Sequence, residues 1–331
     1  MRALACPASL KGALGAPAAA AALADGLRAG GAEAVELPVA DGGEGTAEVL
    51  RLALGGEWRR ADVHDAFGRP RDAYWLLLPD GTAVVESAAA VPLDPDRLDP
   101  LAASSRGYGE LVAAALAEGP ASLLLCLGGT ATMDAGAGLL EVLRELPVPT
   151  RVACDVTATL AEAPRLFGPQ KGAGALELVE SERRYAAREK LVSIRHKTGS
   201  GAAGGLGAAL GFLGGELVPG AALVLDVLGF AASRYDLVVT GESDIWVCLG
   251  GDALDATADW SKTLSGEPQA IPADVAWVGD MNGDGLSDLA IVACSPAVTC
   301  TVQIVAGGAG AEHASVAQIA LDTDGAQPSL R

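Results

Sequence analysis

The sequence predicts an α/β protein with a largely parallel sheet in one domain, a mixed α+β second domain, and a short β-rich segment at the C-terminal end. From residue 1 to about residue 240, short apolar runs alternate with Ala-rich helical segments, a pattern typical of a parallel sheet. The turn Pro79-Asp80-Gly81 joins two apolar runs and predicts a β-hairpin in a second unit that begins near residue 60. Beyond residue 243 the helical pattern stops, so the C-terminal part is predicted to be a different kind of fold.

The expected elements follow in order along the chain. Strands are predicted where short apolar runs occur: Arg2–Cys6, Ala34–Pro38, Tyr74–Leu78, Thr82–Ser87, Ser122–Leu127, Thr150–Asp155, Asp236–Thr240, and then Val275–Val278, Leu289–Ala293 and Val302–Ala306. Helices are predicted in the Ala- and Gly-rich segments: Ala16–Ala29, Gly45–Ala53, Gly107–Glu118, Gly136–Arg144 and Gly205–Leu213. The segment Glu182–Lys197 carries six cations and two anions without an apolar stripe. We interpret it as a solvated helical face, with a misplaced or frameshifted insert as the alternative.

Charge and hydropathy limit the class of protein. The chain carries 23 Lys and Arg against 42 Asp and Glu, a net charge of −19, which argues against nucleic-acid and anionic-membrane partners. No apolar run reaches the ~18 residues of a membrane span, and Met1–Pro7 lacks the length of a secretion signal. We therefore expect a cytoplasmic protein. The close pair Cys294 and Cys300 is more typical of an exported one, so the two ends of the chain suggest different compartments.

Two polar clusters follow the first two predicted strands. Ser9 and Lys11 lie where a strand leads into a helix, whose free N–H groups suit an anion. Asp41 and Glu44 surround Gly42 and Gly43, an arrangement that lets a ligand approach the backbone while a carboxylate binds Mg²⁺ or accepts a proton. An ordinary strand-to-helix turn remains the alternative for the first cluster, and a tight loop with a Glu cap remains the alternative for the second.

Further clusters lie later in the chain. Gly128, Gly129, Thr130 and Thr132 precede a helix and predict a cradle for phosphate or carboxylate, with Asp134 as a candidate base or metal ligand.

Lys171, bracketed by glycines in Phe167–Gly172, is a natural point charge for phosphate. Gly204 and Gly205 belong to another loop that a phosphate could approach, and no Walker A motif occurs.

Taken together and in this order, these stretches resemble the type 1 glycerate kinase family, whose members phosphorylate D-glycerate with ATP. The matching stretches are CPASLKG at 6–12, VADGGEGT at 39–46, FGRP at 67–70, LPDG at 78–81, GGTATMDAGAG at 128–138, ACDV at 153–156, FGPQKGA at 167–173, SGAAGGLGAAL at 200–210 and DLVVTGE at 236–242. The resemblance implies a Rossmann-like domain formed by residues 1–60 with a return strand at 233–242, a second α/β domain at 61–232, and substrates in the cleft between the domains.

The resemblance also implies roles for particular residues. It implies that Ser9 and Lys11 face substrate or phosphate and that Asp41 and Glu44 line the catalytic cleft. Thr132 and Asp134 would belong to the loop on the glycerate side, and Lys171 would be a phosphate ligand. The catalytic candidates are therefore Asp41, Glu44, Asp134 and Lys171. Asp155 and Glu242 are candidates for Mg²⁺ or base roles, and which carboxylate takes which role stays open.

Departures from the family pattern accompany these matches. Ala8 stands where members have Asp, and Met133 where they have Asn, so a polar ligand is lost at each position. Residues 174–198 do not follow the family's usual acidic helix. After residue 242 the family's polar loop and completing strands and helices are replaced by residues 243–331, which carry twelve acids against Lys262 and Arg331. A gene fusion, a frameshift or an assembly artefact would each explain the replacement.

The replacement segment has a signature of its own. Asp280, Asn282, Asp284 and Asp288 stand at positions 1, 3, 5 and 9 of a loop with Gly at position 6, the spacing of a Ca²⁺ loop. Residues of about 270–310 resemble an FG-GAP (integrin-type β-propeller) repeat, with a simple Asp/Gly turn as the alternative.

We therefore expect a phosphotransferase that uses ATP and Mg²⁺ on D-glycerate, with Ca²⁺ at the C-terminal loop. We also expect its activity to be weak and its stability low, because the strands that complete the first domain are absent. Two other readings remain: an exported Ca²⁺-binding adhesion-type module, and an inactive kinase-like small-molecule binder.

Overall fold

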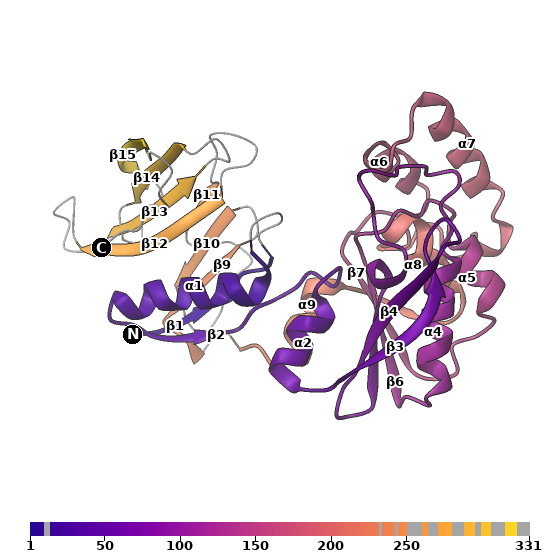
Figure 1. Ribbon diagram of the computed structural model, residues 1–331, viewed down its shortest axis with the longest axis horizontal. Coiled ribbons are helices and arrows are strands. Elements are labelled where there is room, and N and C mark those ends of the chain that lie inside the picture. Colours follow the sequence, from indigo (N-terminus) through magenta and orange to yellow (C-terminus); the bar gives the residue numbers. More distant parts are fainter. Residues whose placement is uncertain are drawn as a thin grey trace. The chain divides into compact units, whose positions relative to one another are not determined.

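The computed structural model describes residues 1–9, 14–231, 234–241, 244–249, 260–263, 271–279, 288–294, 299–305 and 315–322, the last six ranges by their strands. The chain divides into two compact units. Unit 1 consists of residues 1–39 and 231–331, and unit 2 consists of residues 40–230 (Figure 1). Each unit contains a sheet in which parallel strand pairs are combined with antiparallel ones, so the predicted α/β class is confirmed.

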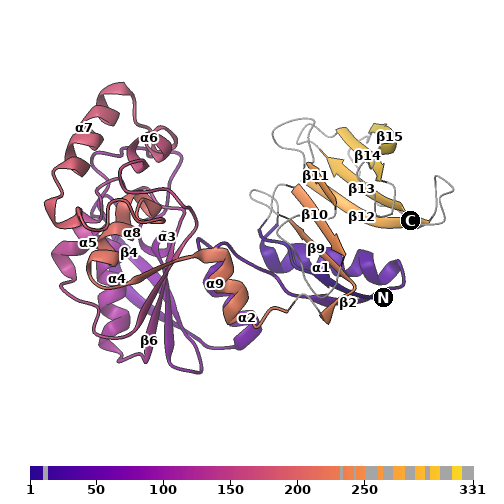
Figure 2. The ribbon, with the colours of Figure 1, turned by 180° about the vertical axis from the view of Figure 1, so that it is seen from behind.

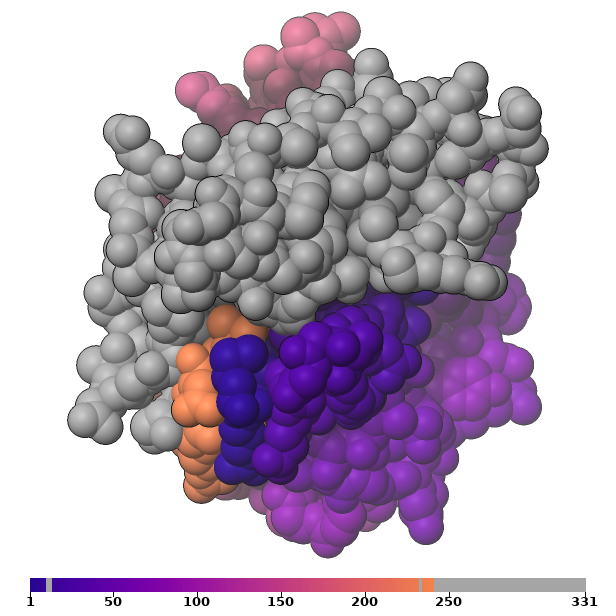
Figure 3. Space-filling model, turned by 90° about the vertical axis from the view of Figure 1, so that its left-hand side faces the viewer, coloured from indigo at the N-terminus to yellow at the C-terminus, as the bar shows by residue number. Residues whose placement is uncertain are grey.

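Unit 1 has a five-stranded sheet in the order β11-β10-β9-β1-β2. Its elements are β1 (Arg2–Ala5), α1 (Ala16–Ala29), β2 (Glu33–Glu36), β9 (Leu237–Gly241), β10 (Asp244–Leu249) and β11 (Trp260–Thr263). The strand β1 runs parallel to both β2 and β9, and Leu4 pairs with Val35 on one side and with Val238 on the other. In Figure 3 the atoms of β9 (orange) lie beside those of β1 (indigo).

The segment after residue 243 extends this sheet. β10 pairs antiparallel with β9, with Cys248 opposite Val238, and β11 pairs antiparallel with β10. The edge of β9 that faces away from β1 is therefore covered by a strand of the C-terminal segment, a pairing that the sequence analysis did not foresee.

A second sheet lies further along the same unit. It is a four-stranded antiparallel meander, in the order β12-β13-β14-β15, formed by β12 (Ile271–Gly279), β13 (Asp288–Cys294), β14 (Thr299–Val305) and β15 (Ser315–Asp322). The three strands predicted in this region fall within β12, β13 and β14, apart from Ala306 beyond the end of β14. Cys294 and Cys300 are register partners across β13 and β14. Of the predicted Ca²⁺ ligands, Asp288 begins β13, and the positions 280, 282 and 284 lie outside the described residues.

Unit 2 has a six-stranded sheet whose spatial order follows the sequence. Its strands are β3 (Glu57–His64), β4 (Pro70–Leu77), β5 (Thr82–Glu86), β6 (Ser122–Leu127), β7 (Thr150–Cys154) and β8 (Glu216–Pro219). The first three strands are antiparallel and the last four are parallel, with β5 shared between the two sets. The predicted hairpin is confirmed as β4 and β5, whereas β3 and β8 are additional strands.

The helices of unit 2 cover both faces of this sheet (Figures 1 and 2). They are α2 (Thr46–Leu54), α3 (Ser87–Ala90), α4 (Arg106–Ala117), α5 (Ala137–Val142), α6 (Ala163–Phe167), α7 (Ala175–Ala186), α8 (Ala202–Phe212) and α9 (Gly220–Val227), with 3₁₀ turns at Pro169–Lys171 and Glu189–Leu191. Residues of α4, α5 and α8 share one core with one face of the sheet, and residues of α2 and α9 share another with the opposite face.

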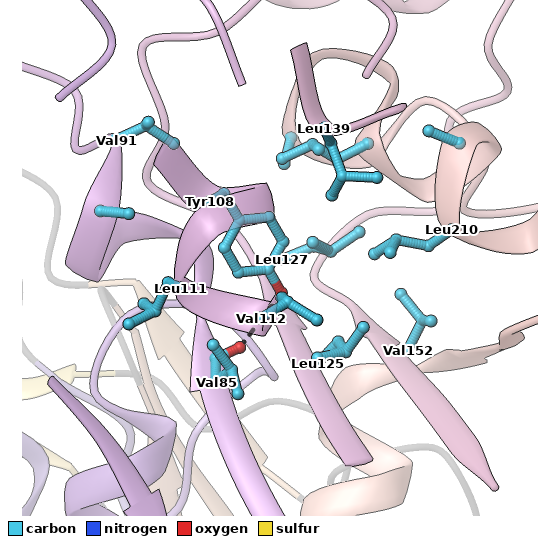
Figure 4. Packing of buried hydrophobic residues seen from close by; sticks show 14 of the residues in the cluster. Val85, Val91, Tyr108, Leu111, Val112, Leu125, Leu127, Leu139, Val152 and Leu210 are labelled. Carbon is cyan, nitrogen blue, oxygen red and sulfur yellow. Dashed lines mark hydrogen bonds between the residues drawn. The ribbon is translucent and has the colours of Figure 1, made fainter. Parts of the chain in front are cut away.

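The strand β6 shows how the sequence fixes this layering. Successive strand side chains point to opposite faces, so Leu123, Leu125 and Leu127 join the core of α4 and α8, while Leu124 and Cys126 join the core of α2 and α9. A strand buried on both faces must be apolar throughout, as the sequence analysis expected of this one. Figure 4 shows the first core, where the buried Tyr108 hydroxyl donates to the carbonyl oxygen of Val85 at 3.1 Å.

The basic segment Glu182–Lys197 is part of unit 2. The helix α7 covers only its beginning and ends at Ala186, so the predicted helical face is wrong beyond that residue. Tyr185, Leu191 and Ile194 are buried in one cluster with residues of the Asp134 loop and of α8. These three side chains make apolar contacts that attach the segment to unit 2, although the segment has no apolar stripe in its sequence.

Candidate functional site

The Gly-rich loop before α2 is held by its own polar groups. The Oδ1 atom of Asp41 accepts a hydrogen bond from the Gly43 N–H at 2.9 Å, and the Thr46 hydroxyl donates to the Gly43 carbonyl oxygen at 2.8 Å. A carboxylate that bonds the backbone two residues on is a standard turn device. Asp41 therefore shapes the loop that carries Glu44, whose side chain is exposed.

The C-terminal end of β5 fastens this loop to a second one. Glu86, the last residue of β5, accepts a hydrogen bond from the Ala47 N–H at 2.7 Å, near the start of α2. Ser87 follows it, and its hydroxyl lies 3.2 Å from both the carbonyl oxygen and the N–H of Gly128. Two adjacent side chains thus hold the loop of residues 41–46 and the loop of residues 128–138. Neither residue is among the site residues predicted from the sequence, although both stand at the end of the predicted strand Thr82–Ser87.

Burial raises the pKa of Glu86 to about 7. The backbone N–H groups of Ala47 and Gly45 oppose this shift, whereas the neighbouring carboxylates of Glu44 and Glu48 add to it. Because the pKa of the folded state lies above the ordinary value of 4.5, the folded protein binds more protons than the unfolded chain between about pH 4.5 and pH 7. The contribution of Glu86 to stability is therefore largest at low pH and falls as the pH rises.

Glu86→Gln tests this assignment, because the amide is an uncharged analogue of the protonated acid. From pH 4.5 to pH 8, the free energy of unfolding of Glu86→Gln should rise by about 3 kcal/mol relative to the native chain, the equivalent of the pKa shift. The measurement is urea unfolding at several pH values. Glu48→Gln, which removes an exposed carboxylate from the first turn of α2, is the matched control and should show a much smaller change. Parallel curves for Glu86→Gln and the native chain would refute the assignment.

The loop that follows β6 lies against the first loop and against Asp155. A Cβ atom added at Gly128 would lie 2.7 Å from Oδ2 of Asp155 and 2.9 Å from the Cα atom of Gly43. A Cβ atom added at Gly129 would lie 3.1 Å from Oε2 of Glu44. These close approaches explain why the sequence has glycines here. They also bring the carboxylates of Glu44 and Asp155 to the same loop.

Asp134 holds the remainder of this second loop. Its Oδ2 atom accepts from the N–H and the hydroxyl of Ser105, both at 2.9 Å, and from the Gly138 N–H at 3.0 Å, while Oδ1 accepts from the Gly136 N–H at 3.0 Å. Four donors thus converge on one carboxylate. The loop between β6 and α5 is tied through it to the start of α4.

Met133, which stands where the resemblance expects Asn, is buried, and its sulfur lies 3.8 Å from the Tyr185 hydroxyl.

Lys171 is the buried cation of unit 2 and is only 4% exposed. Its Nζ atom donates to the carbonyl oxygen of Thr132 at 3.0 Å and lies 3.4 Å from the Thr130 hydroxyl. Burial lowers the pKa of Lys171 to about 8, and the negative charges of Asp155 and Asp134 oppose that shift. A buried ammonium beside a Gly-Thr loop and two carboxylates is an arrangement suited to binding phosphate.

The beginning of α8 closes the far side of this loop. Ala203, Gly204 and Gly205 have positive φ angles of 50°, 66° and 90°. The carbonyl oxygen of Gly204 accepts from the Tyr185 hydroxyl at 2.6 Å, and the Thr132 hydroxyl donates to the carbonyl oxygen of Ala203 at 3.2 Å. Thr132 therefore contributes its carbonyl to Lys171 and its hydroxyl to α8.

Gly204→Ala is expected to destabilise unit 2 by about 3 kcal/mol or more, because a Cβ atom there would overlap the carbonyl oxygen of Thr132 and the left-handed backbone disfavours a side chain. Thermal unfolding measures the loss. Gly214→Ala is the control, since that glycine also has a positive φ but has nothing within 4 Å of the added atom. A similar small loss in both variants would contradict the close approach described here.

Most of the site residues predicted from the sequence lie in unit 2. The structure groups Asp41, Gly42, Gly43, Glu44, Gly128, Gly129, Thr130, Thr132, Asp134, Asp155, Lys171, Gly204 and Gly205 within unit 2. Ser9 lies in unit 1, four residues after the end of β1. Lys11 and Glu242 lie outside the described residues.

No group of three or more His, Cys, Asp or Glu side chains in the described part of the chain is arranged to hold a metal ion. None of the described helices is both long and apolar enough to span a membrane.

Comparison with known proteins identifies the family to which this chain belongs. The profile of the glycerate kinase family matches residues 3–146 and 144–246. The chain belongs to the glycerate kinase family. The resemblance predicted from the sequence is therefore confirmed. All the loops of unit 2 described above fall within the match, and the strands from β11 onward fall outside it.

Named relatives in this family agree with the profile. The chain is 36% identical over 295 residues to glycerate 2-kinase of Escherichia coli (strain K12), covering 74% of this chain and 77% of the relative. It is 36% identical over 297 residues to glycerate kinase of Bacillus subtilis (strain 168), with the same coverage. A crystal structure assigned to glycerate kinase 2 of Salmonella typhimurium LT2 superposes with a TM-score of 0.61 at 33% identity, covering 73% of this chain and 78% of that one.

Proposed function

We propose that this chain transfers a phosphoryl group from ATP to D-glycerate and releases phosphoglycerate. Membership of the glycerate kinase family gives the reaction class. The observation that carries the proposal is the burial of Lys171 against the carbonyl of Thr132, with its pKa lowered to about 8. Burying an ammonium group is costly, and a phosphate ligand for that charge accounts for it.

The charges around Lys171 fit phosphoryl transfer. The reaction needs positioned reactants and cations that offset the charge on the transferred phosphoryl group. Lys171 supplies one such cation, and the N–H groups of Gly129 and Thr130 are proposed as neutral donors after the end of β6. Ser9 and Lys11 of unit 1 are proposed to bind an anionic substrate group.

The carboxylates near Gly43 suit a magnesium ion. A Cβ atom at Gly43 would lie 3.1 Å from Oδ1 of Asp41 and 3.8 Å from the Cβ of Asp155, so the two residues flank one glycine. Mg²⁺ is usually held by one or two carboxylates together with substrate phosphates and water. Asp41 and Asp155 fit that donor set, with Glu242 as a further candidate. When bound, such an ion would offset the negative charge of the phosphate oxygens.

The remaining carboxylates divide between two roles. Glu44 is exposed in the first loop and lies next to Gly129, so we assign it the role of proton acceptor for the attacking hydroxyl group. Asp134 already accepts four hydrogen bonds, which leaves its lone pairs committed to the loop. We therefore propose that Asp134 positions the catalytic loop.

We propose a separate role for the C-terminal segment, which lies beyond the family match. The antiparallel strands β12 and β13 flank residues 280–287, as expected of an FG-GAP-like repeat with its Ca²⁺ loop between two strands. Asp280, Asn282, Asp284 and Asp288 would be the ligands. Calorimetric titration of the full chain with Ca²⁺ tests this role, and Asp284→Ala should abolish the binding.

The kinase proposal is tested by measuring ADP release from the full chain with ATP, Mg²⁺ and D-glycerate. Because residues 243–331 replace the family's own completing elements, we expect a turnover below ~1 s⁻¹, the lower end of the ~1–10³ s⁻¹ common among enzymes. A rate within that range, together with a single cooperative melt, would contradict the predicted impairment. Binding of both substrates without ADP release would contradict the kinase function and favour an inactive small-molecule binder.

A further inference from the structure

A strap of residues 91–101 runs along the phosphate loop of unit 2. At its start, the Leu93 N–H donates to the carbonyl of Gly129 at 2.8 Å, and the Ala131 N–H donates to the carbonyl of Val91 at 3.1 Å. Further on, Leu98 lies against the turn that carries Lys171, since a Cβ atom added at Gly172 would be 2.7 Å from the Cβ of Leu98. The strap therefore contacts both parts of the candidate site.

Arg97 lies in this strap, next to Leu98. Its guanidinium carbon stacks over the ring of Phe67, 3.9 Å from the ring centroid. Its Nη1 atom is buried and has no hydrogen-bond partner in the described part of the chain. A guanidinium group carries five N–H donors, and leaving a buried donor unsatisfied costs free energy. The geometry therefore points to an acceptor that a ligand supplies.

Other arginines around the site have acceptors. Arg188 donates to the carbonyl of Asp134, Arg184 to the carbonyl of Leu101, and Arg106 to Glu110 and Glu141. Arg51 also has a buried nitrogen without a partner, but it lies in the last turn of α2, where the helix dipole favours a cation. Among these arginines, Arg97 alone combines a buried unpartnered donor with a position in the strap, next to Leu98.

We propose that Arg97 binds the carboxylate of the acid substrate. The Phe67 ring covers one face of the guanidinium group, and the unpartnered Nη1 donor lies on its planar edge. That edge matches the two oxygens of a carboxylate. Lys171, a compact charge in the turn that Leu98 contacts, suits the phosphate instead. This assignment rests on the proposed kinase function, and it explains how an acid is preferred over an uncharged alcohol.

Binding of D-glycerate and of ATP to the full chain, each measured separately by calorimetry, tests the proposal. Arg97→Met should weaken D-glycerate binding by about 100-fold and change ATP binding by less than about 3-fold, since charge-assisted hydrogen bonds are the ones removed. Arg97→Lys keeps the charge without the planar edge and should weaken D-glycerate binding by about 10-fold. Arg144→Met removes an exposed arginine of the same unit and should leave both affinities unchanged.

Thermal melting of every variant separates binding from folding, and Arg97→Lys provides the test if Arg97→Met does not fold. Native affinity for D-glycerate in Arg97→Met, or in Arg97→Lys if only that variant folds, would overturn the inference. Weakened ATP binding with unchanged D-glycerate binding would also overturn it, because the oxyanion would then be a phosphate. ADP release measured on the same samples distinguishes a failure of the Arg97 proposal from a failure of the kinase function. A native chain that binds D-glycerate through Arg97 but transfers no phosphate contradicts the kinase function and upholds the site.

Discussion

Lys171→Ala is expected to lower kcat for phosphoryl transfer to D-glycerate by about 10²-fold or more, because a buried cation aimed at developing charge contributes about 3 kcal/mol to the barrier. Lys171 is buried against the Thr132 carbonyl, so few other groups could replace its charge. The measurement is steady-state ADP release. Lys190→Ala, which removes an exposed lysine, is the matched control and should retain the native rate.

The pH dependence of the same reaction tests whether Lys171 is the cation that binds the phosphate. Lys171 has a pKa of about 8 in the folded protein, below its ordinary value of 10.5, so the unfolded chain binds the proton more tightly between those values. Stability attributable to Lys171 therefore rises as the pH increases from about 8 to 10.5, whereas phosphate binding is lost over the same range. The kcat/KM for ATP should fall above about pH 8. In Lys171→Arg that fall should disappear, because an arginine stays charged.

Asp134→Ala is expected to destabilise the protein by about 3 kcal/mol and to lower kcat by about 10²-fold, because the Ser105, Gly136 and Gly138 donors lose their shared acceptor. Asp134→Asn retains one carbonyl oxygen, so it should recover part of both losses. Urea unfolding and ADP release measure the two effects side by side. If Asp134→Asn melted like the native protein yet were as inactive as Asp134→Ala, Asp134 would be a catalytic base.

Much of unit 2 could be predicted from local sequence. The run Ser122–Leu127 is apolar at every position, as a strand buried on both faces requires, and the Pro79-Asp80-Gly81 turn marks the hairpin of β4 and β5. The strand β3 was not predicted because its EWRRADVH sequence has charged residues on a face that is largely open to solvent. The strand β8 has only four residues, too few to give a period.

The site was predicted as a set of residue types, and the roles depended on packing. Asp134, Gly136 and Gly138 have the spacing of a carboxylate that bonds the backbone after it, but the Ser105 donors come from a distant segment. Glu86 and Arg97 carry no local signal, because burial among residues from other strands and loops determines what each side chain does. Sequence reasoning finds loops that follow strands. It does not reveal which polar group lacks a partner inside them.

Phosphorus NMR of the full chain with ATP, Mg²⁺ and D-glycerate follows the formation of phosphoglycerate. It is the most direct test of phosphoryl transfer at the Lys171 loop. The native chain should form phosphoglycerate and ADP in equal amounts and only when D-glycerate is present, and Lys171→Ala should form them about 10²-fold more slowly. ADP without phosphoglycerate, or equal rates in the native chain and Lys171→Ala, would contradict the assignment of the Lys171 loop as the site of phosphoryl transfer.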